Sequence, residues 1–318
     1  MTAILAVRDL EKTFGSVVAA RDITLDVPAL QTVGVIGANG AGKTTFINMI
    51  TGHLKPSKGA ILSVRELEKT FGSVVAARDI TLDVPALQTV GVIGANGAGK
   101  TTFINMITGH LSPSKGTILF EGQDITGRPS REITRLGISR SFQVAQTFPS
   151  LTVYENMCAA AAIARGPDSM WRRALTPLRS PEAEAEAEAA LELFQIARYR
   201  NVPAVTLPQG VRKLLDIAMA IAGWPRLLLL DEPTSGVSIE EKFAIMDVVM
   251  SALKTRNITI LFVEHDMEIV ARFCDRVLAF YDGTVIADGP PAATLDNARV
   301  QEFISGTRKA KVEDVAHA

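Results

Sequence analysis

The chain has 318 residues, enough for one large or two ordinary domains. Its formal net charge is -1, so no nucleic-acid partner is expected and nothing attracts the chain generally to an anionic membrane. Its longest apolar run, residues 157–164, is too short to cross a bilayer, and residues 1–9 lack a signal-peptide pattern. Cys158 and Cys274 have no metal-binding or redox spacing. We therefore expect a protein of a reducing compartment, the cytoplasm, that reaches a membrane only through a partner.

An internal repeat opens the chain. Residues 3–62 match residues 60–119 at an offset of 57 residues, and the run 10–54 recurs unchanged as 67–111. Residues at the junction of the two copies would have to form the last strand of the first copy and also the first strand of the second. The first copy, residues 1–63, is therefore expected to be a partial duplicate and not an independent domain.

Chain connectivity predicts which copy enters the fold, because identical side chains cannot decide it. If the first copy entered the fold, a segment of 57 residues would have to be closed as an internal loop, and loop closure of that length costs about 3 to 4 kcal/mol of free energy. The second copy instead continues directly into Thr117. We predict the second copy in the fold and a first copy that is partly disordered or prone to aggregation, because its apolar strands lack partners.

Each copy contains the same glycine-rich segment, Gly-Ala-Asn-Gly-Ala-Gly-Lys-Thr, at residues 37–44 and 94–101. Such a loop lets backbone N–H groups surround an anion while the lysine reaches the outer phosphates. Residues 89–93 are expected to form a buried strand before it, and the apolar spacing of residues 101–111 predicts a helix after it. A chance glycine-rich turn is the alternative, and this strand and helix disfavour it. The pattern therefore predicts phosphate groups at the positive end of a helix.

The later elements alternate between helix and strand. Strand, helix, strand at this spacing predicts parallel βαβ units. In chain order we expect a strand at 117–121, a helix at 130–136, a strand at 138–142, a mostly helical region at 152–222, a strand at 226–230, a helix at 239–253, a strand at 258–263, a hairpin at 277–280 and 284–287, and a polar tail at 307–318.

Two of these strands end in acidic residues. Asp231 and Glu232 follow the first, and Glu264-His265-Asp266 follow the second. Beside a phosphate loop, Asp231 is suited to hold Mg²⁺, mostly through water, and Glu232 to act as general base on the attacking water. The alternative is that the first pair simply caps a strand. His265 would contact the γ-phosphate or the water, although a lone histidine at a strand end is more often an ordinary surface residue.

These motifs, in the order in which they follow one another along the chain, resemble those of the ATP-binding subunits of ABC transporters. The glycine loop resembles the Walker A motif and residues 227–232 resemble Walker B with its catalytic glutamate. Gln143 resembles the Q-loop glutamine and His265 the switch histidine. Phe71 matches the aromatic residue that stacks on adenine, a core phenylalanine being the alternative.

The resemblance implies ATP and Mg²⁺ as cofactors. It assigns catalytic roles to Glu232, His265 and Gln143, and metal contacts to Thr101, Gln143 and Asp231. The residues it assigns to ATP binding are Phe71, Gly94, Asn96, Gly97, Gly99, Lys100, Thr101, Thr102 and Gly210.

The resemblance also implies the fold, an α/β P-loop NTPase over residues 64–306. It would comprise a RecA-like core, an antiparallel β subdomain and an inserted α-helical subdomain at about residues 144–222. Two ATP-binding subunits, as a homo- or heterodimer, would close head to tail around two ATP molecules. The helical subdomain and the Q-loop would pass this closure to membrane-spanning permease subunits.

Within this superfamily the chain is most similar to the larger ATP-binding subunit of branched-chain (hydrophobic) amino acid importers. Residues 137–143, 148–156, 263–267 and 299–306 and the insertion near 166–190 carry this similarity. It implies a peripheral location on the cytoplasmic side of the inner membrane, and a periplasmic solute-binding protein as an indirect partner. Importers of urea and short amides and the ATPase of lipopolysaccharide export are the related alternatives.

Two positions depart from the family pattern. The Leu-Ser-Gly-Gly-Gln signature reads Leu207-Pro208-Gln209-Gly210-Val211 here, which keeps the glycine but loses the serine hydroxyl and one N–H. Ser238 stands at the aspartate position of the D-loop. These departures favour one alternative, an interaction protein that binds ATP but hardly hydrolyses it. A second alternative is that the duplication makes the product misfold.

Overall fold

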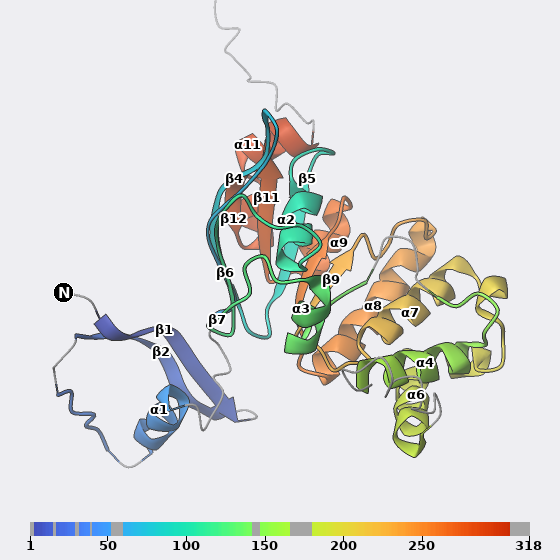
Figure 1. The fold of residues 1–318 in the computed structure, drawn as a ribbon, viewed down its shortest axis with the longest axis horizontal. Helices are drawn as coiled ribbons and strands as arrows, with labels where there is room; N and C mark the ends of the chain where they lie inside the picture. Colours follow the sequence, from blue (N-terminus) through green and yellow to red (C-terminus); the bar gives the residue numbers. More distant parts are fainter. Residues whose placement is uncertain are drawn as a thin grey trace, which may run out of the picture.

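The computed structural model describes residues 3–14, 17–28, 32–38, 40–51, 60–141, 147–165 and 180–305. A six-stranded sheet in the order β12-β11-β5-β10-β9-β8 forms the centre of the fold (Figure 1). Five of its strands are parallel, and β12 pairs antiparallel with β11. Their bounds are β5 (Thr89–Gly94), β8 (Ile138–Arg140), β9 (Leu227–Asp231), β10 (Thr259–Val263), β11 (Arg276–Tyr281) and β12 (Thr284–Gly289).

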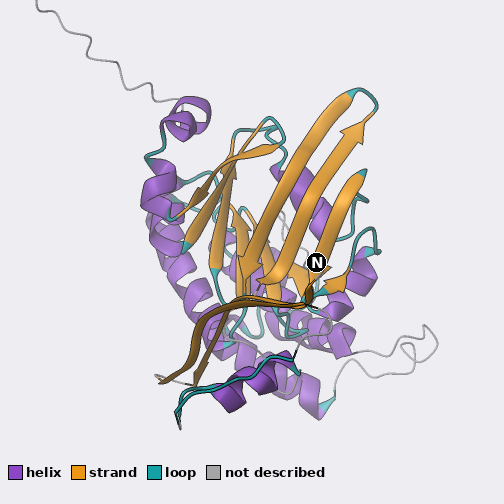
Figure 2. Ribbon diagram, turned by 90° about the vertical axis from the view of Figure 1, so that its left-hand side faces the viewer, coloured by secondary structure: helices purple, strands orange, loops and turns teal. Residues whose placement is uncertain are grey.

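Both faces of this sheet are covered, which explains why its inner strands are continuous apolar runs. Because side chains alternate along a strand, Leu227 and Leu229 of β9 pack in one core while Leu228 and Leu230 pack in the other. The first core includes α2 (Lys100–Ile107), the second α8 (Ile239–Thr255) and α9 (Met267–Phe273). Figure 2 shows helices along both sides of the central strands.

A second, antiparallel sheet packs on the side of α2. Its order is β4-β3-β6-β7, with β3 (Ala60–Phe71), β4 (Val74–Pro85), β6 (Lys115–Phe120) and β7 (Gln123–Asp124). Buried side chains of β3, β4 and β6 join the core that contains Val90 and Val92 of β5. This sheet is the antiparallel β subdomain that the sequence predicts.

A group of helices forms the third part of the fold. It contains α4 (Val153–Arg165), α6 (Pro181–Leu193) and α7 (Gln209–Ala220), which lie together at one end of the molecule in Figure 1. The Ser180 hydroxyl accepts a hydrogen bond of 3.2 Å from the N–H of Ala183, so Ser180 caps α6 and Pro181 is its first residue. These parts together confirm the predicted fold class.

Shorter elements connect or follow these parts: α3 (Ser130–Leu136), 3-10 turns at Ala197–Tyr199 and Ala204–Thr206, α10 (Pro291–Leu295), α11 (Ala298–Val300) and a π-helical turn at Gln301–Ser305. The helix predicted at 101–111 already ends at Ile107, because Gly109 has a φ of 70° and the chain turns there. None of the helices in the described ranges is long and apolar enough to cross a membrane. Gln143, most of the insertion near 166–190 and the predicted tail lie outside the described residues.

The two copies of the repeat have different structures. The second copy supplies β3, β4, β5 and α2 to the larger sheets and their core, as chain connectivity predicts. The first copy forms β1 (Ala3–Phe14) and β2 (Val17–Pro28), a separate antiparallel pair, with α1 (Lys43–Ile50) beside it (Figure 1). Ile36 is 93% exposed, whereas Ile93, its equivalent in β5, is fully buried.

Candidate functional site

A cavity of about 150 Å³ lies where β9 and β10 end and α2 begins. The carboxyl ends of parallel strands are where open α/β sheets commonly bind ligands. The lining of the cavity includes the glycine loop, the acidic residues at the end of β9 and the histidine after β10. The full set is Ala76, Asn96, Gly97, Ala98, Gly99, Lys100, Thr101, Thr102, Asp231, Glu232, Val263 and His265.

Two glycines of the loop occupy positions that no side chain would fit. Gly94 has a φ of 156°, and a Cβ there would lie 2.5 Å from the carbonyl oxygen of Phe280. Gly99 has a φ of 97°, and its Cβ would lie 2.6 Å from the carbonyl oxygen of Ala76. The loop therefore passes close to neighbouring backbone and enters α2 directly after Gly99.

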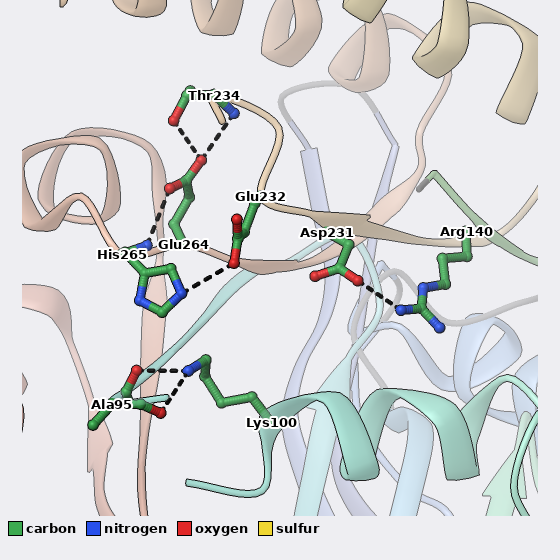
Figure 3. Close-up of polar contacts among 9 residues, drawn as sticks. Ala95, Lys100, Arg140, Asp231, Glu232, Thr234, Glu264 and His265 are labelled. Carbon is green, nitrogen blue, oxygen red and sulfur yellow. Dashed lines mark hydrogen bonds and ion pairs between the residues drawn. The ribbon is translucent and has the colours of Figure 1, made fainter. Parts of the chain in front are cut away.

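Lys100 extends back over this loop. Its Nζ donates hydrogen bonds to the carbonyl oxygens of Gly94 at 2.6 Å and of Ala95 at 3.0 Å (Figure 3). Burial lowers the pKa of Lys100, while the charges of Glu232 and Asp231 oppose that shift. The ammonium is thus held beside the loop and faces two carboxylates.

Those carboxylates have different partners. Asp231, the last residue of β9, accepts a hydrogen bond of 2.6 Å from Nη2 of Arg140. Oε1 of Glu232 lies 3.0 Å from Nε2 of His265, so the two predicted catalytic groups meet across the ends of β9 and β10 (Figure 3). Glu232 has a φ of 46°, a left-handed conformation that is uncommon for glutamate and fixes where its side chain starts.

Glu264 accepts hydrogen bonds from both Thr234 and His265. Its carboxylate is buried and accepts hydrogen bonds from the Thr234 hydroxyl at 2.6 Å and the Thr234 N–H at 3.0 Å. The other oxygen accepts one from the N–H of His265 at 3.1 Å. This buried acceptor therefore joins the segment after β9 to the segment after β10.

The structure brings most of the predicted residues together, but not all of them. Gly94 contacts Lys100 at the edge of the site, as described above. Phe71 is half-exposed at the end of β3 and is not part of the cavity lining, although the Nζ of Lys69 lies 5.2 Å from its ring centre. Gly210 lies on α7, packed against Ile245, and also stands outside the lining.

Sequence reasoning missed several residues around the site. Arg140 and Glu264 lie at or just after strand ends, in stretches already noted for their similarity to the importer subunits, but neither was given a role. A charged residue at the carboxyl end of a predicted parallel strand is the signal that would have identified Glu264, whereas Arg140 falls in the middle of the strand predicted at 138–142. Ala76 enters the lining from β4 with no sequence signal of its own.

The residues of the cavity fit a magnesium ion that is held together with a nucleotide. The Thr101 hydroxyl and the Asp231 carboxylate, both oxygen donors, line the same cavity. Within the described part of the chain no group of three or more histidine, cysteine or acidic side chains could hold a metal by itself. Mg²⁺ in nucleotide sites is typically bound by one or two protein oxygens plus phosphates and water, as this donor set allows.

Comparison with known proteins identifies the family. The family model described as ABC transporter matches residues 20–75 and 77–235. The branched-chain amino acid transport ATP-binding protein BraF of Pseudomonas aeruginosa is 35% identical over 243 residues, which cover 76% of this chain and 95% of that protein. The branched-chain amino acid transport ATP-binding protein LivG of Escherichia coli strain K12 is 34% identical with the same coverage.

A relative from an archaeon and two solved structures agree with this. The probable branched-chain amino acid transport ATP-binding protein LivG of Archaeoglobus fulgidus is 32% identical, covering 80% of this chain and 98% of its own. An ATP-binding cassette of an ABC transporter in its ADP conformation is 30% identical, with a TM-score of 0.67, and covers 78% of this chain and 98% of its own. A nucleotide-free cassette is 27% identical, with a TM-score of 0.67, and covers 77% and 98%. The chain therefore belongs to the ABC transporter family and carries the ATPase domain of that family.

Proposed function

We propose that the chain is the ATP-hydrolysing subunit of a membrane importer for branched-chain or other hydrophobic amino acids. The observation that carries the proposal is one cavity that joins the phosphate loop, Lys100, Asp231 and the Glu232–His265 pair. The substrate class rests on the similarity to BraF and LivG, which are branched-chain amino acid transport ATP-binding proteins. ATP hydrolysis would drive the conformational change that moves the amino acid.

In this mechanism the glycine loop and Lys100 bind the phosphates of ATP. The loop N–H groups and the positive end of α2 face the anion, and Lys100 exchanges its two carbonyl acceptors for phosphate oxygens. Thr101 and Asp231 would hold Mg²⁺, which neutralises charge on the phosphates when bound.

Hydrolysis then needs a base and a group that orients it. Water attacks the γ-phosphorus, the bond to the bridging oxygen breaks, and ADP and phosphate leave. Glu232 accepts the proton of the water, and His265 holds the Glu232 carboxylate at 3.0 Å while contacting the γ-phosphate. Both groups start from rigid strand ends, so little rearrangement is required.

The site of one chain is completed by a second subunit in this proposal. As a member of the ABC transporter family, the chain is expected to dimerise and to act with membrane-spanning permease subunits. Gly210 stands outside its own chain's cavity, which suits a signature helix that faces the ATP of a partner. The partner would be a second ATP-binding subunit, identical or different, and the permease would hold both on the cytoplasmic side of the inner membrane. A periplasmic solute-binding protein would deliver the amino acid.

One structural feature favours weak hydrolysis as a second candidate function. Pro208 is the residue before α7 and gives that helix no side-chain cap, where the family pattern has a serine hydroxyl. A subunit of this kind would bind ATP and dimerise but turn it over slowly.

A matched pair of lysine variants tests the proposed hydrolysis. Lys43 in the first copy donates to the carbonyl oxygens of Gly37 and Ala38 at 2.6 and 2.7 Å, the same two hydrogen bonds that Lys100 makes in the second. We expect Lys100→Ala to abolish ATP hydrolysis and Lys43→Ala to leave it intact. The opposite result would refute the assignment of the site. A wild-type protein that binds ATP without hydrolysing it would favour the second candidate function. The transport role needs a separate experiment, in which leucine uptake is measured in vesicles that contain the permease.

A further inference from the structure

Arg140 makes two hydrogen bonds that connect the elements around the cavity. It is the last residue of β8, and it stands beside Leu229 in the register with β9. Its Nη2 donates to Oδ2 of Asp231 at 2.6 Å, and its Nη1 donates to Oδ1 of Asn105 at 2.7 Å. One guanidinium therefore contacts both the end of β9 and the side of α2.

The contact on α2 lies on the face that carries Thr101. Asn105 follows Thr101 by four residues in the helix, which places both on one side, one turn apart. Thr101 and Asp231 are the two described residues that we expect to hold Mg²⁺. Arg140 thus holds together, through Asn105 and Asp231, the two elements that would supply the oxygen donors.

This ion pair is shielded from solvent. The exposed fraction is 11% for the Arg140 side chain and 17% for that of Asp231. In Figure 3, the Asp231 oxygen that is not bonded to Arg140 points to the side on which Glu232 and Lys100 lie. Charge-assisted hydrogen bonds in such surroundings are stronger than surface pairs and hold a carboxylate in one orientation.

We propose that Arg140 is a positioning residue that fixes Asp231 so that one carboxylate oxygen is presented to the magnesium ion of the nucleotide. This inference rests on the proposed ATP hydrolysis. It deepens that proposal by assigning the metal affinity of the site to a residue that contacts neither nucleotide nor metal. Arginine suits this role because its planar fork can bond Asp231 and Asn105 at once, which a lysine ammonium cannot reproduce in the same geometry.

Nucleotide binding measured with and without Mg²⁺ tests this role separately from hydrolysis. A fluorescent ATP analogue is titrated into the full-length protein in EDTA and at increasing Mg²⁺ concentrations. We expect Arg140→Met to raise the Mg²⁺ concentration for half-maximal effect about tenfold or more, as is typical when a residue that orients a metal ligand is removed. Affinity for the analogue in EDTA should stay unchanged.

Two further variants separate positioning from simple support of the fold. Arg140→Lys keeps the charge but not the fork, and it should recover only part of the loss. Asn105→Ala keeps the Arg140–Asp231 pair and removes its tie to α2, so it should weaken Mg²⁺ binding several-fold, again with no change in EDTA. Arg272→Met, which breaks an exposed pair with Asp247, is the control and should behave as wild type. Mn²⁺ binding followed by electron paramagnetic resonance provides a second readout.

The possible outcomes distinguish the two proposals. If the wild type responds to Mg²⁺ and Arg140→Met responds equally or more tightly, the inference is overturned while the proposed function stands. Equal weakening in EDTA and in Mg²⁺ would also overturn it, because that pattern indicates a structural role only. A wild type whose affinity for nucleotide does not depend on Mg²⁺ would overturn both.

Discussion

Nε2 of His265 lies 3.0 Å from Oε1 of Glu232, although 33 positions separate the two residues in the sequence. The contact exists because β9 and β10 are parallel neighbours that end at the same edge of the sheet. Glu264, directly before the histidine, is anchored to Thr234 on the other side of the strand ends. The proposed base and the group proposed to orient it are therefore placed by sheet register.

Replacing Glu232 should remove hydrolysis but not nucleotide binding. Glu232→Gln keeps the size of the side chain and a group able to face His265, but it removes the basic carboxylate. We expect ATP turnover to fall by about 10²- to 10⁴-fold, measured as phosphate release, with affinity for ATP retained. Glu188→Gln, at an exposed ion pair with Arg200, is the control and should hydrolyse ATP normally. Normal turnover by Glu232→Gln would exclude it as the base.

We expect Glu264 to affect catalysis by holding His265 in position. Glu264→Gln turns one buried oxygen that accepts a hydrogen bond into a donor, which costs about 1–3 kcal/mol when the partner groups are buried. We expect a lower melting temperature and a lower kcat, with a smaller change in KM for ATP. Thr234→Val, which removes only the hydroxyl, should lower both the melting temperature and kcat by less. An unchanged kcat in Glu264→Gln would refute a positioning role.

The repeat provides a matched test of the loop glycines. Gly99 has a φ of 97° and Gly42, its equivalent, a φ of 82°, and a Cβ at either would contact a backbone oxygen. Gly99→Ala should cost about 1–2 kcal/mol for the left-handed conformation alone, and should weaken ATP binding. Gly42→Ala should leave ATP binding unchanged, because none of the described residues of the first copy lines the cavity. Equal losses in the two variants would contradict the assignment of the site to the second copy.

Restoring the signature serine should raise turnover. Pro208 precedes α7 and Pro129 precedes α3, and neither provides a side-chain cap. Serine at either position should add about 1 kcal/mol of stability by capping the helix. Only Pro208→Ser is expected to increase ATP hydrolysis, because only that position faces a partner's nucleotide in the proposed dimer. A stabilised Pro208→Ser with unchanged turnover would show that the hydroxyl has no role in hydrolysis here.

Acid should weaken the fold through Asp266. Burial raises the pKa of Asp266, but hydrogen bonds from Lys242 and from the N–H groups of Ile269 and Glu268 outweigh it and hold the pKa below its usual value. A carboxyl whose pKa is lowered on folding stabilises the native state above its unfolded pKa, and this contribution is lost as the pH falls through the folded value.

Asp266→Asn isolates this effect, because asparagine still caps α9. We expect the variant to be less stable than wild type near pH 7, and the difference to shrink below about pH 4. Urea denaturation across this range measures it. A difference that is constant with pH would show that the charge of Asp266 is not responsible.

Most of the fold follows from local patterns and their order. The apolar runs of β9 and β10 and the glycine loop identify the central sheet, because few residue types fit a buried parallel strand or a phosphate loop. The same patterns place Lys100, Asp231, Glu232 and His265 at one edge of it. The end of α2 and the length of β8 were harder to predict, because a turn at Gly109 and the pairing of an edge strand depend on neighbours distant in sequence.

The contacts within the site could not be predicted. Arg140 reaches Asp231 only because β8 pairs with β9 in one particular register. The roles of Phe71 and Gly210 also stay predictions, since they depend on a nucleotide and a second subunit. Sequence patterns identify the residue types of the site, whereas tertiary register decides which of them touch.

The repeat also affects how the chain folds. Residues 32–36 and 89–93 have one sequence, yet the first segment is exposed and the second is the strand between β10 and β11. During folding, both segments compete for that place with identical side chains. Loop closure favours the second at equilibrium, but a molecule that docks the first copy must open again before it can exchange. We therefore expect refolding of the full chain to meet a kinetic trap that a chain beginning at Ala60, the first residue of β3, would not have.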